Sequence, residues 1–461
     1  MQNSPESMAL AVIDSCADCD VCRYLMEDTP CRVFPALYEL YDRAREGGVV
    51  SPGELRNLVD LCNFCALCPC QNVRSEIMKA KHAFISRDGI DPAIRLLEDI
   101  ERLAKVCGAY PSLANKLFQG NRTGGVLKKI TGIHPDRNLP VFPGKDFANW
   151  AEKNGLRGRQ TGEGKRVAFF AGCTGQYLFP DVPKAAVEVL RRNGIDVYMP
   201  EQKCCGMPSL LEGDIRLTLK MVSFNLDRLC EAVDSGYRIV CSCPTCAYML
   251  KHVLSEGAYY SREYRESAVR ETGTPEQAGQ SKLRQYKPSK IDNLLRDEGC
   301  FSSVDALKRI KVAENTFDLG EYLRDLRDTG EFNENFGPVP AKTAYYPPCH
   351  LREQKIGEPY ADLLALLPGI SMKRIDGAFH CCGIAGIMGF KKSFHPVSVE
   401  IGSRLAEKIK EIHPERLAVD CLSCRIQFNQ MLPYKVFHPI EILCEAYRNF
   451  RTGPESSPVA I

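Results

Sequence analysis

Two copies of a five-cysteine pattern constrain this 461-residue chain more than any other feature. Each copy is centred on two adjacent cysteines and a glycine, Cys204-Cys205-Gly206 in the first and Cys381-Cys382-Gly383 in the second. One cysteine lies upstream of each pair and a Cys-x-x-Cys lies downstream. The sets are Cys173, Cys204, Cys205, Cys243 and Cys246, then Cys349, Cys381, Cys382, Cys421 and Cys424. Unreactive core thiols do not explain ten matched positions, so the pattern predicts two metal sites.

Five thiols per set exceed the four that a simple four-iron cubane takes from a protein. The extra, adjacent thiol indicates either that one sulfur bridges two irons or that one cysteine is left for chemistry. The glycine after each pair suits a tight loop around a cluster. We therefore expect one or two iron–sulfur clusters here, which need not be cubane.

Two cysteine triplets near the N-terminus predict a second kind of cluster site. Three cysteines at x2-x2 spacing wrap three corners of a 4Fe-4S cluster, and in two-cluster ferredoxins the fourth cysteine of each run ligates the other cluster. The pattern predicts two 4Fe-4S clusters. One is held by Cys16, Cys19, Cys22 and Cys70, and the other by Cys62, Cys65, Cys68 and Cys31.

The fourth ligands depart from the usual ferredoxin spacing, which would place them at Met26 and Asn72. Zinc is the alternative metal, because four-cysteine zinc sites are common. Zinc modules, however, usually use separated Cys-x2-Cys pairs rather than triplets. A zinc-stapled interaction protein therefore stays a rival hypothesis, from a different functional class.

Charge and hydropathy exclude several classes of protein. Sixty basic residues against 58 acidic ones give a net charge of +2, which offers no field for nucleic acid. No apolar run is long enough for a spanning helix, and the N-terminus has no signal-peptide pattern. We expect a cytoplasmic protein with reduced thiols, either free or peripheral on the inner face of the cell membrane.

The order of expected elements predicts a multidomain α + α/β fold. A helical ferredoxin-like domain (1–75) comes first, then a helical extension and linker (76–160), in which residues 93–107 form one apolar helical stripe. Two duplicated α/β units with parallel strands (161–254 and 337–461) flank a charged insertion (255–336). Parallel strands would place the cysteines at their carboxyl ends.

Several C-terminal motifs resemble those of the family that supplies the iron–sulfur subunit of anaerobic glycerol-3-phosphate dehydrogenase. They are Cys381-Cys382-Gly383-Ile384-Ala385-Gly386, Gly389-Phe390-Lys391-Lys392, Asp420-Cys421-x2-Cys424-Arg425 and His438-Pro439-Ile440-Glu441. More broadly, the chain is similar to glycolate oxidase iron–sulfur subunits and to heterodisulfide reductase. The resemblance implies a double-cluster helical domain followed by two cysteine-rich CCG domains.

The resemblance also implies a function in electron transfer. The chain has no flavin or nicotinamide fingerprint of its own, so an FAD-containing dehydrogenase or another flavoprotein would be the donor and a quinone or redox protein the acceptor. An electron-transfer subunit is expected rather than a stand-alone catalyst. The alternative is a heterodisulfide (thiol-disulfide) reductase that uses a non-cubane cluster in a CCG domain.

The two units differ beside their cysteines. His350 follows Cys349 and His380 precedes Cys381, where the first unit has Thr174 and Lys203. A histidine next to a cluster can tune its potential or supply a proton, although an ordinary loop histidine fits equally well. We assign His350, His380, Cys381 and Cys382 to a catalytic, terminal site. Lys391 and Lys392 would either offset cluster charge or form a solvated pair.

Overall fold

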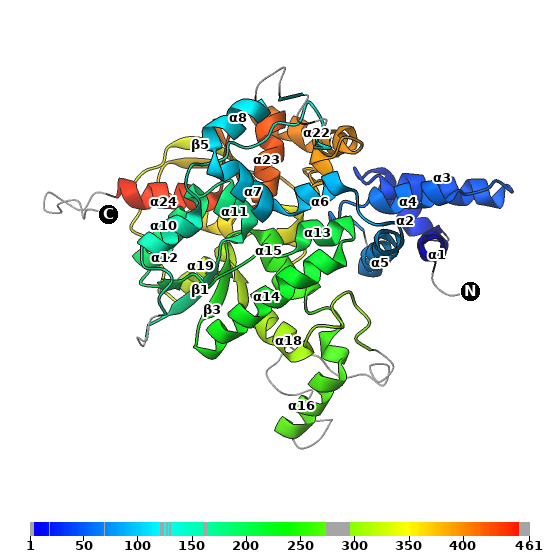
Figure 1. Ribbon diagram of the computed structural model, residues 1–461. Coiled ribbons are helices and arrows are strands. Elements are labelled where there is room, and N and C mark those ends of the chain that lie inside the picture. Colours follow the sequence, from blue (N-terminus) through cyan, green and yellow to red (C-terminus); the bar gives the residue numbers. More distant parts are fainter. Residues whose placement is uncertain are drawn as a thin grey trace, which may run out of the picture.

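The chain forms a central α/β body with a helical domain projecting from one side, as the computed structural model shows (Figure 1). The structure describes residues 4–17, 19–68, 70–119, 124, 125, 128, 131–159, 164–272 and 296–450. Its N-terminal part is helical, and the described residues contain two four-stranded sheets whose strands are all parallel. The predicted fold class is therefore confirmed.

The N-terminal helical domain keeps its cysteines at helix ends and in loops. Its helices are α1 (Pro5–Ala17), α2 (Asp20–Glu27), α3 (Val33–Arg45), α4 (Pro52–Asp60) and α5 (Gln71–Asp88). A capping box is present at the start of α4. Ser51 Oγ accepts from the Glu54 amide at 3.4 Å, and Glu54 Oε2 accepts from the Ser51 amide at 2.9 Å.

The helical extension crosses from this domain to the α/β body. The single helix expected over 93–107 is two helices, α6 (Pro92–Glu98) and α7 (Ile100–Ala109). Asp99 separates them with φ −89° and ψ 69°, because its carboxylate accepts from the Arg102 amide and starts a new helix. The extension continues with α8 (Pro111–Gln119) and α10 (Phe147–Lys153).

The first sheet has the strand order β2-β1-β3-β4. Its strands are β1 (Arg166–Phe170), β2 (Asp196–Tyr198), β3 (Arg238–Cys241) and β4 (Thr316–Asp318). Sequence reasoning did not predict β4, which lies within 255–336. The helices of this region are α11 (Gly172–Tyr177), α12 (Asp181–Arg192), α13 (Met207–Glu212), α14 (Ile215–Asp234), α15 (Pro244–Tyr248), α16 (Arg262–Thr272), α18 (Ala306–Glu314) and α19 (Leu319–Asp328).

The second sheet repeats this topology with the order β6-β5-β7-β8. Its strands are β5 (Ala341–Tyr346), β6 (Ile370–Arg374), β7 (Arg416–Val419) and β8 (Lys435–Phe437). The helices are α20 (Cys349–Arg352), α21 (Pro359–Leu364), α22 (His395–Ile412), α23 (Leu422–Met431) and α24 (Pro439–Asn449). Strand and helix order agree between the units, as expected for an internal duplication.

The two units pack against each other through two pairs of helices. Helix α12 of the first unit packs on α24 of the second, while α19 of the first packs on α21 of the second. One apolar core, which includes Leu190, Leu323, Leu363 and Leu443, runs across this interface. Because the contact uses helices from both units in two places, it fixes how the two sheets face each other.

Buried charges join the two units near the helical domain. Lys391 is only 5% exposed, and its Nζ lies 2.8 Å from Glu212 Oε2 at the end of α13. Lys81 of α5 lies 3.5 Å from Asp60 in the same region. Lys391 is therefore not part of a solvated pair, whereas its neighbour Lys392 is exposed.

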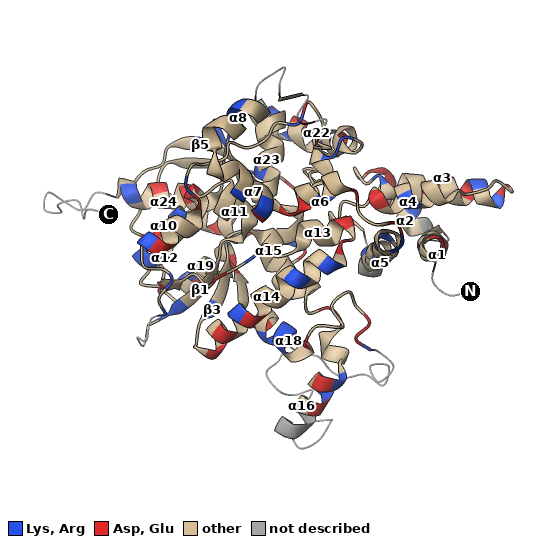
Figure 2. Ribbon diagram, viewed as in Figure 1, with Lys and Arg blue, Asp and Glu red and all other residues tan. Residues whose placement is uncertain are grey.

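On the outer helices, charges of both signs are mixed. Figure 2 shows basic and acidic residues interspersed along outer helices such as α3 and α14, in keeping with the net charge of +2. Across the described ranges, no helix is both long and apolar enough to cross a membrane.

Replacing Lys391 by methionine should lower the melting temperature strongly. The change leaves the Glu212 carboxylate buried without its cation, and removing one partner of a buried pair costs about 3–5 kcal/mol. The double variant K391M/E212M should recover most of the loss, while K392M on the exposed neighbour should be close to neutral. Thermal unfolding of the three variants checks this, and equal effects of K391M and K392M would contradict it.

Alanine at Gly383 should destabilise the protein more than alanine at the equivalent Gly206. Both glycines have left-handed backbones, with φ +85° and +93°, which cost a side chain about 1–2 kcal/mol. At Gly383 the new Cβ would also lie 2.1 Å from the Ser398 carbonyl oxygen, whereas at Gly206 the nearest atom is a Thr218 methyl carbon at 3.1 Å. Melting temperatures of the paired variants test this; a larger loss for G206A would refute it.

Candidate metal centres

The ten predicted thiols of the α/β units gather at the carboxyl ends of their strands. Cys173 lies in α11 just after β1, and Cys349 begins α20 after β5. Cys243 and Cys421 occupy the N-cap positions of α15 and α23, after β3 and β7. Parallel sheets place loop residues from different strands at one edge in this way.

The five thiols of the first unit form one connected set. Cys173 Sγ lies 3.3 Å from Cys204 Sγ. Cys205 contacts the Cys204 and Cys246 thiols, and Cys246 contacts Cys243. All five are buried. The structure thus brings together the whole set that the sequence pattern predicted.

The second unit repeats this connectivity. Cys382 Sγ lies 3.0 Å from Cys424 Sγ, and Cys424 contacts Cys421. Cys381 contacts both Cys349 and Cys382. The second predicted set is therefore also brought together.

The two sets also meet each other and the helical domain. The Cys243 thiol of the first unit contacts the Cys421 thiol of the second. The Cys381 thiol contacts Cys65, and Asn63 Nδ2 approaches Cys381 Sγ at 3.8 Å. A row of neighbouring thiols consequently runs from the helical domain through the second unit into the first.

The N-terminal cysteines fall into the two groups that the cross-over pattern predicted. Cys16, Cys19, Cys22 and Cys70 lie close enough for their charges to interact, and Cys31, Cys62, Cys65 and Cys68 do the same. Cys70 is exposed, whereas Cys31, Cys62 and Cys65 are buried. Their roles as ligands stay predictions.

Neighbouring hydrogen-bond donors lower the pKa of one thiol in each adjacent pair. Hydrogen bonds from Cys204 and Cys246 lower the pKa of Cys205 to about 6, and a backbone amide, that of Met207, adds to them. Cys382 has the same surroundings in the second unit: Cys381, Cys424 and the Ile384 amide lower its pKa well below the usual value. One thiol of each adjacent pair, Cys205 or Cys382, thus favours the thiolate that a metal requires, while the pKa of its neighbour, Cys204 or Cys381, is raised.

His350 connects three regions without touching a predicted ligand sulfur directly. Its Nδ1 lies 3.0 Å from Thr245 Oγ1, which in turn lies 3.5 Å from Cys421 Sγ. Its Nε2 lies 3.2 Å from the Phe64 carbonyl, in the loop of the second N-terminal triplet. His350 therefore links the loop of the second N-terminal triplet to Thr245 of the first unit, and its catalytic assignment stays a prediction.

His380 lies in a different environment. Burial lowers the pKa of its imidazole, and its Nδ1 is buried with no partner among the described residues. Its carbonyl oxygen accepts from Tyr346 Oη and Arg352 Nη2, both at 3.1 Å. These contacts hold the chain just before Cys381, and they leave the catalytic assignment of His380 a prediction.

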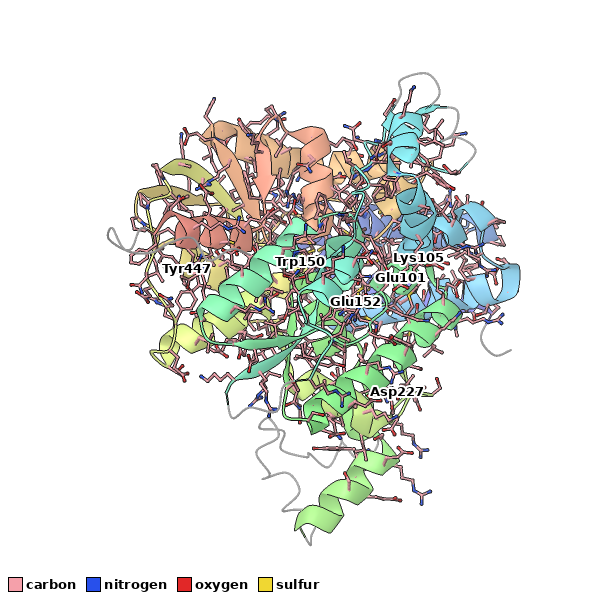
Figure 3. The ribbon with its side chains drawn as sticks, turned by 60° about the vertical axis from the view of Figure 1, so that its left-hand side comes forward. Glu101, Lys105, Trp150, Glu152, Asp227 and Tyr447 are labelled. Atoms are coloured by element: carbon pink, nitrogen blue, oxygen red, sulfur yellow. The ribbon has the colours of Figure 1, made fainter. Side chains whose placement is uncertain are left out.

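Sequence reasoning missed three residues beside the thiols, Asn63, Thr245 and Glu101. Glu101 Oε1 accepts from the Cys204 amide at 2.6 Å, and burial raises the pKa of this carboxyl. It comes from α7 in the extension, where Figure 3 labels it near Lys105. No local motif marks Glu101, because its partner lies 103 positions along the chain.

Cys241 lies at the end of β3, close enough to Cys205 and Cys243 for their charges to interact, but it is not one of the predicted ligands. It is fully buried, and its equivalent in the second unit, one residue before Asp420, is Val419. An apolar residue at the matching position indicates that Cys241 fills core space. Cys107 is likewise buried, as predicted, in an apolar cluster with Ala114 and Phe142.

The donor sets fit iron–sulfur clusters. In the two α/β units every predicted ligand but the half-buried Cys349 is buried, and the thiols are in contact chiefly with one another, as ligands of a shared cluster would be. Within the part of the chain that the structure describes, no three His, Cys, Asp or Glu side chains surround one point as ligands of a single ion. An extended row of thiols suits several irons better than one zinc ion.

Comparisons with known proteins agree with this chemistry. A family model described as a cysteine-rich domain, CCG, matches residues 167–251 and 343–429. These two stretches carry both five-thiol sets.

Three curated relatives extend the similarity beyond these domains. One, a subunit of anaerobic glycerol-3-phosphate dehydrogenase from Escherichia coli K12, is 26% identical over 78% of each chain. A subunit of fumarate reductase (CoM/CoB) from Methanothermobacter marburgensis is 25% identical over 62% of this chain and 47% of its own. Lactate utilization protein A of an Exiguobacterium strain is 26% identical over 61% and 98%. The chain thus contains two cysteine-rich CCG domains, as predicted, in an iron–sulfur protein similar to the glycerol-3-phosphate dehydrogenase relative.

Proposed function

We propose that the protein is an iron–sulfur electron-transfer subunit of an oxidoreductase complex, working between a separate flavoprotein dehydrogenase and a quinone or other redox acceptor. The observation that carries this is the row of neighbouring thiols from the helical domain to both sheets. Bound clusters would supply one-electron carriers along that row. The relatives named as dehydrogenase and reductase subunits support the same role.

The contacts favour an order for the sites. Cys70, in the first N-terminal group of thiols, is exposed, which suits the group that meets a donor. Cys65 then leads to Cys381 in the second unit, and Cys421 leads to Cys243 in the first. This order makes the first unit the far end, the reverse of the terminal role that the sequence suggested for Cys381 and Cys382.

The proposed donor surface lies on α2, beside the first N-terminal triplet. Val21 and Tyr24 are 62% and 75% exposed, and Leu25 is 40% exposed. Apolar side chains grouped on one short helix are typical of a surface that binds another protein. A flavoprotein bound there would lie next to Cys19 and Cys22.

Alanine at Cys382 should remove the iron and sulfide of one cluster while the helical-domain signals persist. Cys382 contacts two other predicted ligands, and the helical domain has its own set of thiols. Cys444→Ala is the matched control, because Cys444 is equally buried but lies in α24 away from the row. Iron and acid-labile sulfide analysis with electron paramagnetic resonance of anaerobically purified protein measures the difference.

Equal iron contents in the two variants would refute the ligand role of Cys382. A colourless wild-type protein that contains zinc and no sulfide would refute the electron-transfer proposal as a whole.

A second candidate function is a thiol-disulfide reductase, favoured by the two complete five-thiol sets. A fifth thiol leaves room for a site that binds and splits a disulfide. If this is correct, chemically reduced, anaerobic protein should convert a mixed or symmetric disulfide into two thiols per two electrons. Thiol titration measures the product. No turnover by protein with intact clusters would exclude this function and leave the electron-transfer role.

A further inference from the structure

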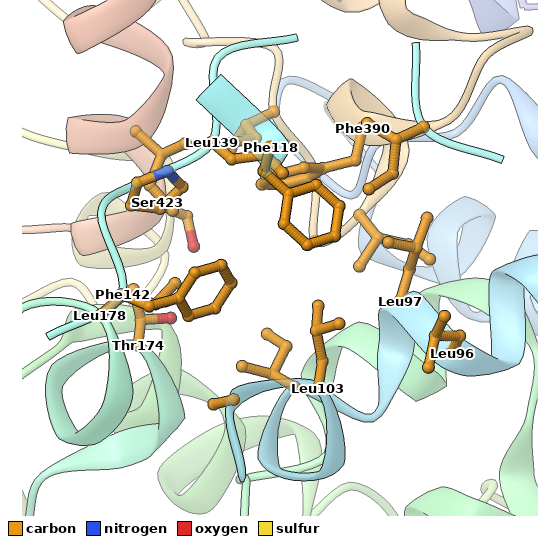
Figure 4. A pocket seen from close by; sticks show the side chains of 18 of the residues that line it. Leu96, Leu97, Leu103, Phe118, Leu139, Phe142, Thr174, Leu178, Phe390 and Ser423 are labelled. Atoms are coloured by element: carbon orange, nitrogen blue, oxygen red, sulfur yellow. The ribbon is translucent and has the colours of Figure 1, made fainter. Parts of the chain in front are cut away.

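An apolar cavity lies where the helical extension meets both cysteine-rich units (Figure 4). Helices α6 and α7 form one wall, with Leu96, Leu97 and Leu103 pointing into the space. The loop after Cys382, which carries Ile384 and Ile387, forms a second wall, and α11 with α23 forms a third. Part of the space between these walls is open to solvent.

The lining selects an uncharged, flat ligand. It contains no charged side chain, and the rings of Phe118, Phe142 and Phe390 surround the space. Thr131, Thr174 and Ser423 are its polar side chains. Burying a charge here without a partner would be costly, whereas an aromatic ring gains by packing against the phenylalanines.

The cavity also adjoins predicted ligands of both units. Thr174 follows Cys173, Ser423 precedes Cys424, and Ile384 is two residues after Cys382. Figure 4 shows the hydroxyl oxygens of Thr174 and Ser423 at the edge of the space. A molecule in the cavity would therefore lie beside both five-thiol sets, and its carbonyl oxygens could accept from these hydroxyls.

We propose that this cavity binds the ring of a quinone-type electron acceptor. The proposal rests on the proposed electron-transfer function and chooses among its acceptors. Reduction turns the two ring carbonyls into two hydroxyls. It takes two electrons, delivered through this chain from the reduced flavoprotein, and two protons from water at the open side. A ligand that carries charged groups, such as a charged disulfide, does not suit this lining.

Photolabelling tests the site without relying on turnover. Purified wild-type protein with its clusters is mixed with a short-chain azido-naphthoquinone, illuminated, digested and analysed by mass spectrometry. The label should map to α6, α7 or the loop containing Ile387 and Phe390. A non-photoreactive naphthoquinone should compete, and its dissociation constant follows from the competition.

Tryptophan substitutions supply matched variants. Leu103→Trp places a large ring in the cavity from α7 and should weaken naphthoquinone binding about tenfold or more. Leu96→Trp should do the same from α6, which keeps the test valid if one variant folds poorly. Val106→Trp is the control, because Val106 is on α7 but is 67% exposed and outside the lining. Iron and sulfide contents should be equal in all three.

These measurements separate a failure of the cavity assignment from a failure of the electron-transfer function. If the protein has iron and sulfide, bleaches with dithionite and is reoxidised by ferricyanide, the electron-transfer function stands. Label that then spreads over the surface, or equal binding by L103W and V106W, overturns the cavity assignment alone. Competition by a charged disulfide but not by the naphthoquinone also overturns it. Protein that cannot be reduced and reoxidised refutes the function itself.

Discussion

Contact among buried thiols is the constraint on which the rest of this structure depends. A thiolate in an apolar interior is costly unless something stabilises it, and burial raises the pKa of Cys31, Cys62 and Cys241 accordingly. Cys205 and Cys382, the second cysteine of each pair, avoid this cost by accepting from neighbouring thiols and backbone amides. Those donors come from two segments in each unit, the loop of the adjacent pair and the downstream Cys-x-x-Cys, so the sheet and its loops must be correctly assembled before the site exists.

The reciprocal packing of the two units follows from the same requirement. Contacts of α12 with α24 and of α19 with α21 turn the carboxyl edges of the sheets toward each other, so that Cys243 meets Cys421. His350 then links this junction to the helical domain through Thr245 and the Phe64 carbonyl. The two units thereby share one interface, so a substitution in either unit at that interface alters contacts of the other.

The sequence predicted the parallel units and the thiol sets, because each rests on local spacing or periodicity. It missed β4, a three-residue strand inside a charged stretch, since so short a strand is specified by pairing with β3 rather than by its own pattern. It did not indicate that the helix ends at Asp99 and a new one begins, because apolar residues continue at helical spacing across that position. The burial of Lys391 depends on Glu212, 179 positions away, so no local rule indicates it.

The duplicated units differ in the segments that their thiol sites contact. The second unit contacts the helical domain through Cys381 and His350, and the first has Thr174 and Lys203 where the second has its histidines. The first unit instead receives Glu101 of the extension, whose carboxylate binds the Cys204 amide. The same helix, α7, forms a wall of the apolar cavity. Each set of thiols therefore has its own neighbour outside the α/β units. The extension contacts the first set through Glu101, and the helical domain contacts the second set through Cys65.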